Sequence, residues 1–125
     1  MHLSKVIPLS LAFLLGISQP ADVDLPVSTE DVARILESLP EAVSVVPIRP
    51  RQVLVYSRTW GFRHSSIPAG VKAMQLLGQK TRAFTAIHSE DPSMFDVDNL
   101  TAFDAVIMLN TTGDCLATQK GSRNP

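Results

Sequence analysis

Apolar residues between positions 51 and 125 fall into three short runs that predict β-strands. The expected strands are Gln52–Ser57, Phe84–His88 and Ala105–Leu109. The first is a continuous apolar stretch with β-branched residues, which is typical of a buried parallel strand. The second is less apolar, so we expect it nearer an edge of the sheet.

Between the first two strands, apolar residues recur at helical spacing. Ile67 and Leu77 bound this pattern, which predicts a helix over about Ser66–Leu77. Pro68 is compatible with the first turn of a helix. Gly78 is expected to end it, because glycine is common just after the last helical residue.

Strand, helix, strand, turn and strand in this order predict an α/β fold. The expected architecture is part of a doubly wound parallel sheet with strand order 2-1-3. The sheet is expected to be truncated after the third strand, so that segment 51–125 is only the N-terminal half of a domain.

Residues 19–50 are predicted to form an N-terminal helix and a Pro-rich linker. Ser28 and Asp31 resemble a capping box at the start of this helix, and Pro40 stops it. Pro47 and Pro50 favour an extended chain up to the first strand.

Residues 1–18 are predicted to be a signal peptide. His2 and Lys5 precede an apolar stretch of about 12 residues, which is shorter than the ~20 residues that span a bilayer. Cleavage near Ser18 would leave a secreted or periplasmic chain with no stable membrane span. An uncleaved anchor or a misassigned start is the alternative.

Composition narrows the classes of partner and site. Hydrophobic residues make up 45% of the chain and charged residues 18%, the balance of a globular protein. Eleven basic and twelve acidic residues provide no electrostatic footprint for nucleic acid. Cys115 and three scattered histidines match no metal-ligand spacing, so we predict no metal site.

Two polar loops follow the first and third strands. The first carries Arg63, His64 and Ser65, and the second is Asn110-Thr111-Thr112-Gly113-Asp114. In the order 2-1-3 these strands are neighbours, and ligands bind where the strand order reverses. The two loops are therefore predicted to line one ligand site.

Simpler roles compete with ligand binding at several of these positions. Ser65 or Ser66 suits a helix N-cap better than a ligand contact. Gly113 relieves a tight turn, and Asp114 caps the next element. Trp60 and Phe62 either pack over the sheet edge or form a platform on which a sugar stacks; neither role is favoured here.

The histidines differ in their context. His64 precedes a predicted helix, where a neutral imidazole can act as acid, base or hydrogen-bond donor. His88 is interpreted as a surface residue. Cys115 is not expected to be a nucleophile, because it lies several residues beyond its strand and no helix follows it.

Three segments resemble the ThuA-like (trehalose-utilisation) family. They are Val53-Leu54-Val55-Tyr56-Ser57, then Gly61-Phe62-Arg63-His64-Ser65-Ser66-Ile67-Pro68, then Phe103 to Asp114. The resemblance covers about half of the chain and the front half of a family domain. It implies a flavodoxin-like sheet of the class I glutamine amidotransferase-like group.

The resemblance also implies a function. Relatives of full length are expected to act on a carbohydrate in saccharide breakdown, with His64 catalytic. Ligand binding is then assigned to Arg63, Ser65, Asn110, Thr111, Thr112, Gly113 and Asp114. The alternative is a non-catalytic sugar-binding or protein-interaction module. No cofactor is indicated.

An incomplete domain has further expected consequences. The chain alone is expected to be inactive and marginally stable, because a switch-point pocket needs walls from later loops. Exposed strand edges are expected to promote self-association.

Overall fold

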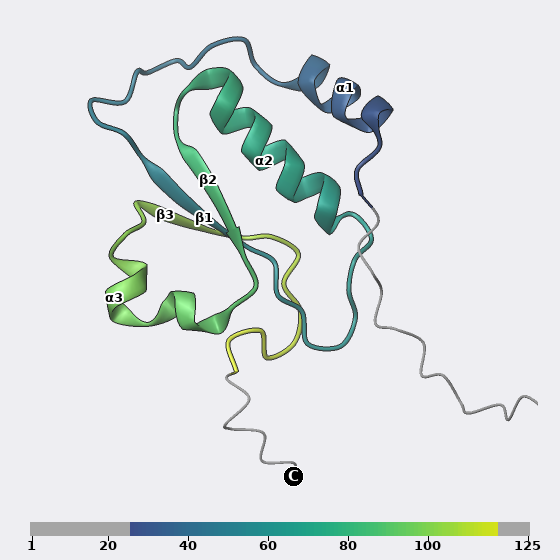
Figure 1. Ribbon diagram of the computed structural model, residues 1–125, viewed down its shortest axis with the longest axis vertical. Coiled ribbons are helices and arrows are strands. Elements are labelled where there is room, and N and C mark those ends of the chain that lie inside the picture. Colours follow the sequence, from purple (N-terminus) through teal and green to yellow (C-terminus); the bar gives the residue numbers. More distant parts are fainter. Residues whose placement is uncertain (1–25, 118–125) are drawn as a thin grey trace, which may run out of the picture.

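The protein forms a three-stranded parallel sheet, seen in a computed structural model that describes residues 26–117 (Figure 1). The strands are β1 (Gln52–Tyr56), β2 (Thr85–Ser89) and β3 (Ala105–Met108). Their order is β2-β1-β3, with β1 parallel to both neighbours. This confirms the predicted α/β fold and strand order.

The core lies around the central strand β1, whose last four residues are buried. Val55 packs with Ile67 and Val71 of helix α2 (Ile67–Thr81) on one face. On the other face, the ring of Tyr56 meets Phe95 edge-on, with 4.8 Å between the ring centroids. A central strand covered on both faces explains its continuous apolar sequence.

Helix α2 continues past the predicted stop at Gly78 to Thr81. Arg82 ends it with a left-handed backbone (φ 57°), and its N–H donates to the Gly78 carbonyl. A Cβ atom at position 78 would lie 2.4 Å from the carbonyl oxygen of Phe84. Gly78 therefore permits close packing of the helix on the chain entering β2, and the prediction that it ends the helix is wrong.

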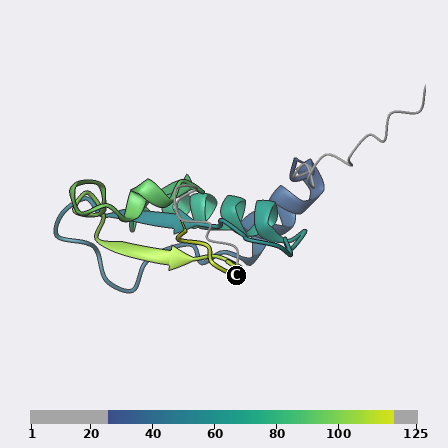
Figure 2. The same ribbon diagram turned by 90° about the horizontal axis from the view of Figure 1, so that it is seen from below.

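Helix α1 (Thr29–Ser38) begins as the capping pattern predicts. The hydroxyl of Ser28 accepts a hydrogen bond from the Asp31 N–H at 3.0 Å. The helix lies alongside α2 at one end of the molecule (Figure 1, Figure 2). Lys80 of α2 donates to the carbonyls of Leu36 and Leu39, so its ammonium ties the end of α1 to α2.

The connection from β2 to β3 contains two short helical elements. They are the 3₁₀ helix η1 (Pro92–Phe95) and helix α3 (Val97–Leu100). Asp91 caps η1 by accepting from the Ser93 N–H at 2.9 Å, and this hydrogen bond lowers the pKa of Asp91. The sequence predicted turns and a helical turn in this region.

Within residues 26–117, β2 and β3 are the outer strands, each with one edge that pairs with no further strand. Self-association through such an edge stays a prediction. The predicted signal peptide lies outside the described residues. In the part of the chain that is described, no helix has the length and apolar character needed to cross a membrane.

Candidate functional site

The loops after β1 and β3 are joined side by side. Thr59 and Thr112 form an isolated parallel bridge, and the Trp60 N–H donates to the Thr112 carbonyl at 2.9 Å. The hydroxyl of Thr112 donates to the Phe62 carbonyl at 2.6 Å. The two loops predicted to line one site therefore lie together at the carboxyl ends of their strands.

A second link joins the third-strand loop to the start of α2. The amide of Asn110 donates to the hydroxyl of Ser66 at 2.9 Å. Ser66 occupies the N-cap position, but its side chain caps no backbone N–H. The N-cap interpretation is thus right for the position of Ser66 and wrong for its hydroxyl. Ser65 is exposed beside it.

Gly113 is required where the loops touch. Its φ is +59°, and a Cβ atom there would lie 2.4 Å from the Trp60 carbonyl oxygen. A side chain at position 113 would meet both backbone strain and a collision with the neighbouring loop. Gly113 therefore acts through its backbone shape, as the tight-turn interpretation has it.

The remaining predicted site residues lie at the same edge with fewer restraints. His64 is exposed, and its ring meets Phe62 edge-on at a centroid distance of 4.7 Å. Thr111 is half-buried and Asp114 is exposed. Among residues 26–117, the side chains of these three polar residues have no hydrogen-bond partner.

Two aromatic side chains on the first loop face solvent. Trp60 is 49% exposed and Phe62 is 69% exposed. The guanidinium of Arg58 lies 5.8 Å from the centroid of the Trp60 ring. Both roles considered for these aromatics, packing over the sheet edge and sugar stacking, stay predictions.

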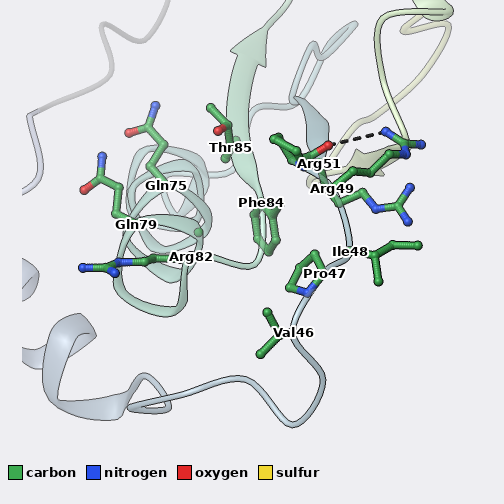
Figure 3. A pocket seen from close by; sticks show the side chains of 13 residues that line it. Val46, Pro47, Ile48, Arg49, Arg51, Gln75, Gln79, Arg82, Phe84 and Thr85 are labelled. Atoms are coloured by element: carbon green, nitrogen blue, oxygen red, sulfur yellow. Dashed lines mark hydrogen bonds between the residues drawn. The ribbon is translucent and has the colours of Figure 1, made fainter.

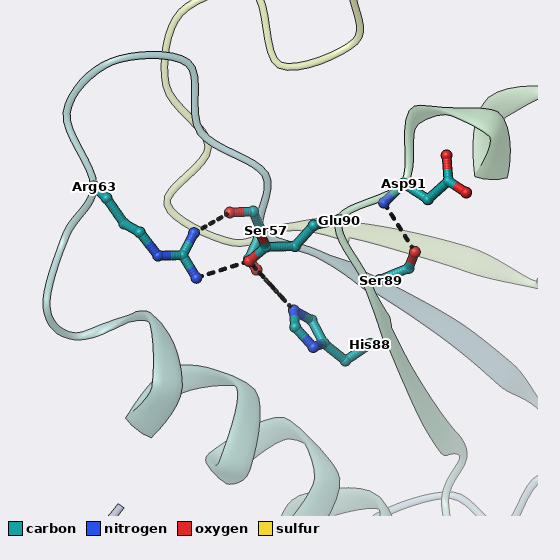
Figure 4. A network of polar contacts seen from close by, with 6 residues as sticks. All are labelled: Ser57, Arg63, His88, Ser89, Glu90 and Asp91. Carbon is teal, nitrogen blue, oxygen red and sulfur yellow. Dashed lines mark hydrogen bonds and ion pairs between the residues drawn. The ribbon is translucent and has the colours of Figure 1, made fainter. Parts of the chain in front are cut away.

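A polar network that the sequence did not predict lies next to these loops (Figure 4). Ser57, fully buried at the end of β1, lies 2.7 Å through its Oγ from both His88 Nε2 and Glu90 Oε1. Arg63 reaches across from the first loop and donates to Glu90 Oε1 at 2.8 Å. Glu90 and Arg63 also form an ion pair.

The number of protons available in this network determines which groups donate hydrogen bonds and which accept them. A serine hydroxyl has one proton, and here Glu90 accepts it. Nε2 of His88 must then donate to Ser57 Oγ, which leaves Nδ1 as the ring's acceptor when His88 is neutral. His88 does lie at the surface, as predicted, but it also belongs to this network.

The pairing register of β1 and β2 would have predicted this network from the sequence. Val55 pairs with His88 across β1 and β2, so both side chains point to the same face of the sheet. Ser57 and Glu90 each follow by two residues and keep that face. A serine after a buried strand, opposite two alternating polar residues, is a detectable pattern once the pairing is known.

Tyr56 anchors the segment that follows the third-strand loop through the backbone of Cys115. The hydroxyl of Tyr56 donates to the Cys115 carbonyl at 2.6 Å, and burial raises the pKa of Tyr56. Cys115 thus takes part through its backbone. In the described part of the chain, no group of three histidine, cysteine, aspartate or glutamate residues is arranged to hold a metal ion.

A cleft of about 750 Å³ lies at the opposite end of the sheet (Figure 3). Phe84 and the side chains at the end of α2 form one wall, and the segment 46–51 forms the other. None of the predicted site residues lines this cleft. Beside it, Asp104 accepts hydrogen bonds from the Gln52 N–H, Arg51 and Arg49, which lower the pKa of Asp104 to about 2.

Comparison with known proteins identifies the family. Residues 52–123 match the family described as ThuA, trehalose utilisation. No curated protein and no solved structure matches the chain. The match covers more than half of the 125 residues, including all three strands and both joined loops. The chain therefore belongs to the ThuA (trehalose utilisation) family.

Proposed function

We propose that the joined loops form a carbohydrate-binding site in which His64 is the acid–base residue. The observation that carries this proposal is the pair of exposed aromatics, Trp60 and Phe62, on a loop that Thr112 holds in place. Aromatic faces pack against the apolar faces of sugar rings, and a fixed platform loses little conformational entropy on binding.

Polar groups around the platform would bind the sugar hydroxyls. Arg63, Ser65, Thr111 and Asp114 supply donors and acceptors, and the Asn110 and Thr112 side chains hold the loop shape. Gly113 permits the close approach of the loops. This mixture of an apolar platform and a few polar groups suits a polyhydroxylated ring.

His64 is the predicted group for proton transfer. Its imidazole packs on Phe62 and is exposed to an approaching ligand. Histidine exchanges protons near neutral pH, which general acid–base catalysis requires. The alternative function is a site that binds sugar without turning it over.

Trp60 is the single tryptophan of the chain, so its fluorescence reports directly on the platform. Titration of the protein with trehalose, glucose and other disaccharides is expected to give a saturable change in emission for at least one sugar. Phe62→Ala should weaken that binding about tenfold, as a lost stacking contact of ~1.4 kcal/mol would. Ile48→Ala, an exposed apolar residue beside the other cleft, is the matched control and should bind normally. A flat titration with every sugar would contradict the proposal.

His64→Ala separates the two functions. Loss of turnover with unchanged sugar binding supports an enzyme with His64 as its acid–base residue. Binding without turnover in the unaltered protein, under conditions where sugar products are measured directly, supports the binding module.

The same proposal includes export of the chain. N-terminal sequencing of protein recovered from outside the cytoplasm is expected to begin near Gln19, after cleavage at Ser18. Cytoplasmic protein that retains Met1 would contradict it.

A further inference from the structure

Within the described residues 26–117, Glu90 uses only one of its two carboxylate oxygens. Oε1 accepts from the Ser57 hydroxyl at 2.7 Å and from Arg63 at 2.8 Å. Oε2 has no hydrogen-bond partner within residues 26–117. The Glu90 side chain is 38% exposed, so this oxygen is accessible from solvent.

We infer that Glu90 Oε2 is the acceptor for a hydroxyl group of the bound carbohydrate. This inference rests on the proposed function and adds a residue that the sequence did not place in the site. Carboxylate oxygens form strong hydrogen bonds with neutral hydroxyl donors because the acceptor is charged. A sugar hydroxyl is such a donor.

The surroundings of Glu90 hold Oε2 in a fixed direction. Ser57 is fully buried and the Arg63 side chain is only 16% exposed, so both donors to Oε1 are themselves restrained. His88 donates to Ser57 in turn, which orients the hydroxyl toward Glu90. A carboxylate that is already oriented pays less entropy on binding than a free side chain does.

The location of Glu90 agrees with the platform. Glu90 follows β2, and Arg63 links it to the loop that carries Trp60 and Phe62 (Figure 4). Arg63 therefore connects the stacking surface to the acceptor. The inferred subsite lies on the β2 side of the first loop, and the third-strand loop lies on the other side.

The inference is tested by combining a substitution of Glu90 with the removal of single hydroxyl groups from the sugar. The probes are glucose, its 2-, 3-, 4- and 6-deoxy derivatives and trehalose. The affinity of each sugar is measured from the change in Trp60 fluorescence. One deoxy derivative is expected to bind the unaltered protein about tenfold or more weakly, the loss of a hydrogen bond to a charged acceptor. In Glu90→Gln, the difference in affinity between glucose and that derivative should shrink. The amide retains an acceptor for Arg63, but its neutral N–H group can only donate to the sugar hydroxyl and replaces a hydrogen bond to a charged acceptor with a weaker one.

Asp91→Asn is the matched control. Asp91 is the neighbouring acid, and its carboxylate caps η1, a role that asparagine can also fill. This variant should keep the discrimination between glucose and the deoxy derivative. Equal loss of discrimination in both variants would overturn the assignment to Glu90.

A measurement on the unaltered protein covers the case in which Glu90→Gln fails to fold. The ¹³Cδ resonance of Glu90 should shift on adding glucose and shift much less on adding the weak deoxy derivative. Sugar binding with no dependence on Glu90 in either experiment overturns this inference and leaves the proposed function standing. No sugar binding at all overturns both.

Discussion

Two carboxylates at opposite ends of the sheet are bonded in different ways. Asp104, at the amino end, uses both oxygens: Oδ2 accepts from the Gln52 backbone N–H, and Oδ1 accepts from Arg49 and Arg51. Glu90, at the carboxyl end, uses only Oε1 in the part of the chain that the structure describes, and its donors there are side chains.

The difference indicates that the Asp104 carboxylate has a structural role, whereas the Glu90 carboxylate is available to bind a ligand. Asp104 fastens the incoming linker and the start of β3 to β1, because its own N–H also donates to the Gln52 carbonyl. Its hydrogen-bonding capacity serves the fold. Glu90 keeps an acceptor at the edge where parallel sheets bind ligands. The cleft of about 750 Å³ lies at the amino end, but the size of a cleft alone does not locate the chemistry.

The largest expected effects come from one glycine at each end. Gly78→Ala and Gly113→Ala both place a Cβ atom 2.4 Å from a carbonyl oxygen. Gly78 lies in the core contact between α2 and Phe84, so its variant should lose about 1–3 kcal/mol of unfolding free energy. That corresponds to a fall in Tm of roughly 4–8 °C for each kcal/mol.

Gly113→Ala should mainly displace the neighbouring loop. We expect a clear shift in Trp60 emission with a smaller fall in Tm than Gly78→Ala shows. Thermal unfolding and fluorescence of the two variants decide this. The comparison of the two ends fails if Gly78→Ala is the variant that changes Trp60 emission.

Ser57→Ala should have the next largest effect, about 1–3 kcal/mol of unfolding free energy. Its buried hydroxyl joins His88 to Glu90, and alanine leaves both without that partner. Denaturant unfolding gives the value. Ser38→Ala removes an exposed hydroxyl that bonds only within α1 and should cost under about 0.5 kcal/mol. Equal effects of the two substitutions would show that the network adds no stability.

The sequence predicted the sheet well because each strand carries its own local signal. The run Val53-Leu54-Val55-Tyr56 is apolar and β-branched, which is typical of a buried parallel strand, and it forms the central strand β1. The end of α2 was misplaced because Gly78 serves a contact with Phe84 that lies outside its own helix. Local glycine rules contain no information on such packing.

The candidate site was predicted only in part for the same reason. Strand order was enough to bring the loops of Trp60 and Thr112 together. The roles of Ser57 and Glu90 depend on the register of β1 against β2, which no single segment specifies. His88 looks like a surface histidine until its opposite neighbour is known.

Acid should reveal the contribution of Asp104. Its pKa is lowered from 3.8 to about 2, first by the Gln52 N–H and then by Arg51. A carboxyl whose pKa is lower in the folded state stabilises the fold above its unfolded pKa, and this contribution is lost as pH falls from about 4 to 2. Denaturant midpoints at pH 7, 4 and 2.5 should therefore fall less steeply with acid in Asp104→Asn than in the unaltered protein. Parallel pH profiles would contradict the role given to Asp104.

The smallest expected effect concerns Lys80 and the end of α1. The last turn of α1 has no basic residue, and Lys80 of α2 supplies the positive charge there by donating to the carbonyls of Leu36 and Leu39 at 2.9 and 3.0 Å. A cation at a helix C-terminus is favourable because it meets the negative end of the helix dipole and the unpaired carbonyls.

Lys80→Met keeps the apolar stem and removes the charge. Because α1 has no buried residue, we expect a loss of about 1 kcal/mol confined to α1, with the unfolding of the sheet nearly unchanged. Amide hydrogen exchange is the suitable measurement: protection should fall about fivefold across α1 and stay constant in β1. Lys72→Met, on the same helix but with no hydrogen bond or ion pair from its side chain among residues 26–117, is the control. Loss of protection in β1 equal to that in α1 would mean that α1 is an integral part of the sheet's folding unit, and not a helix held to its flank by one ammonium group.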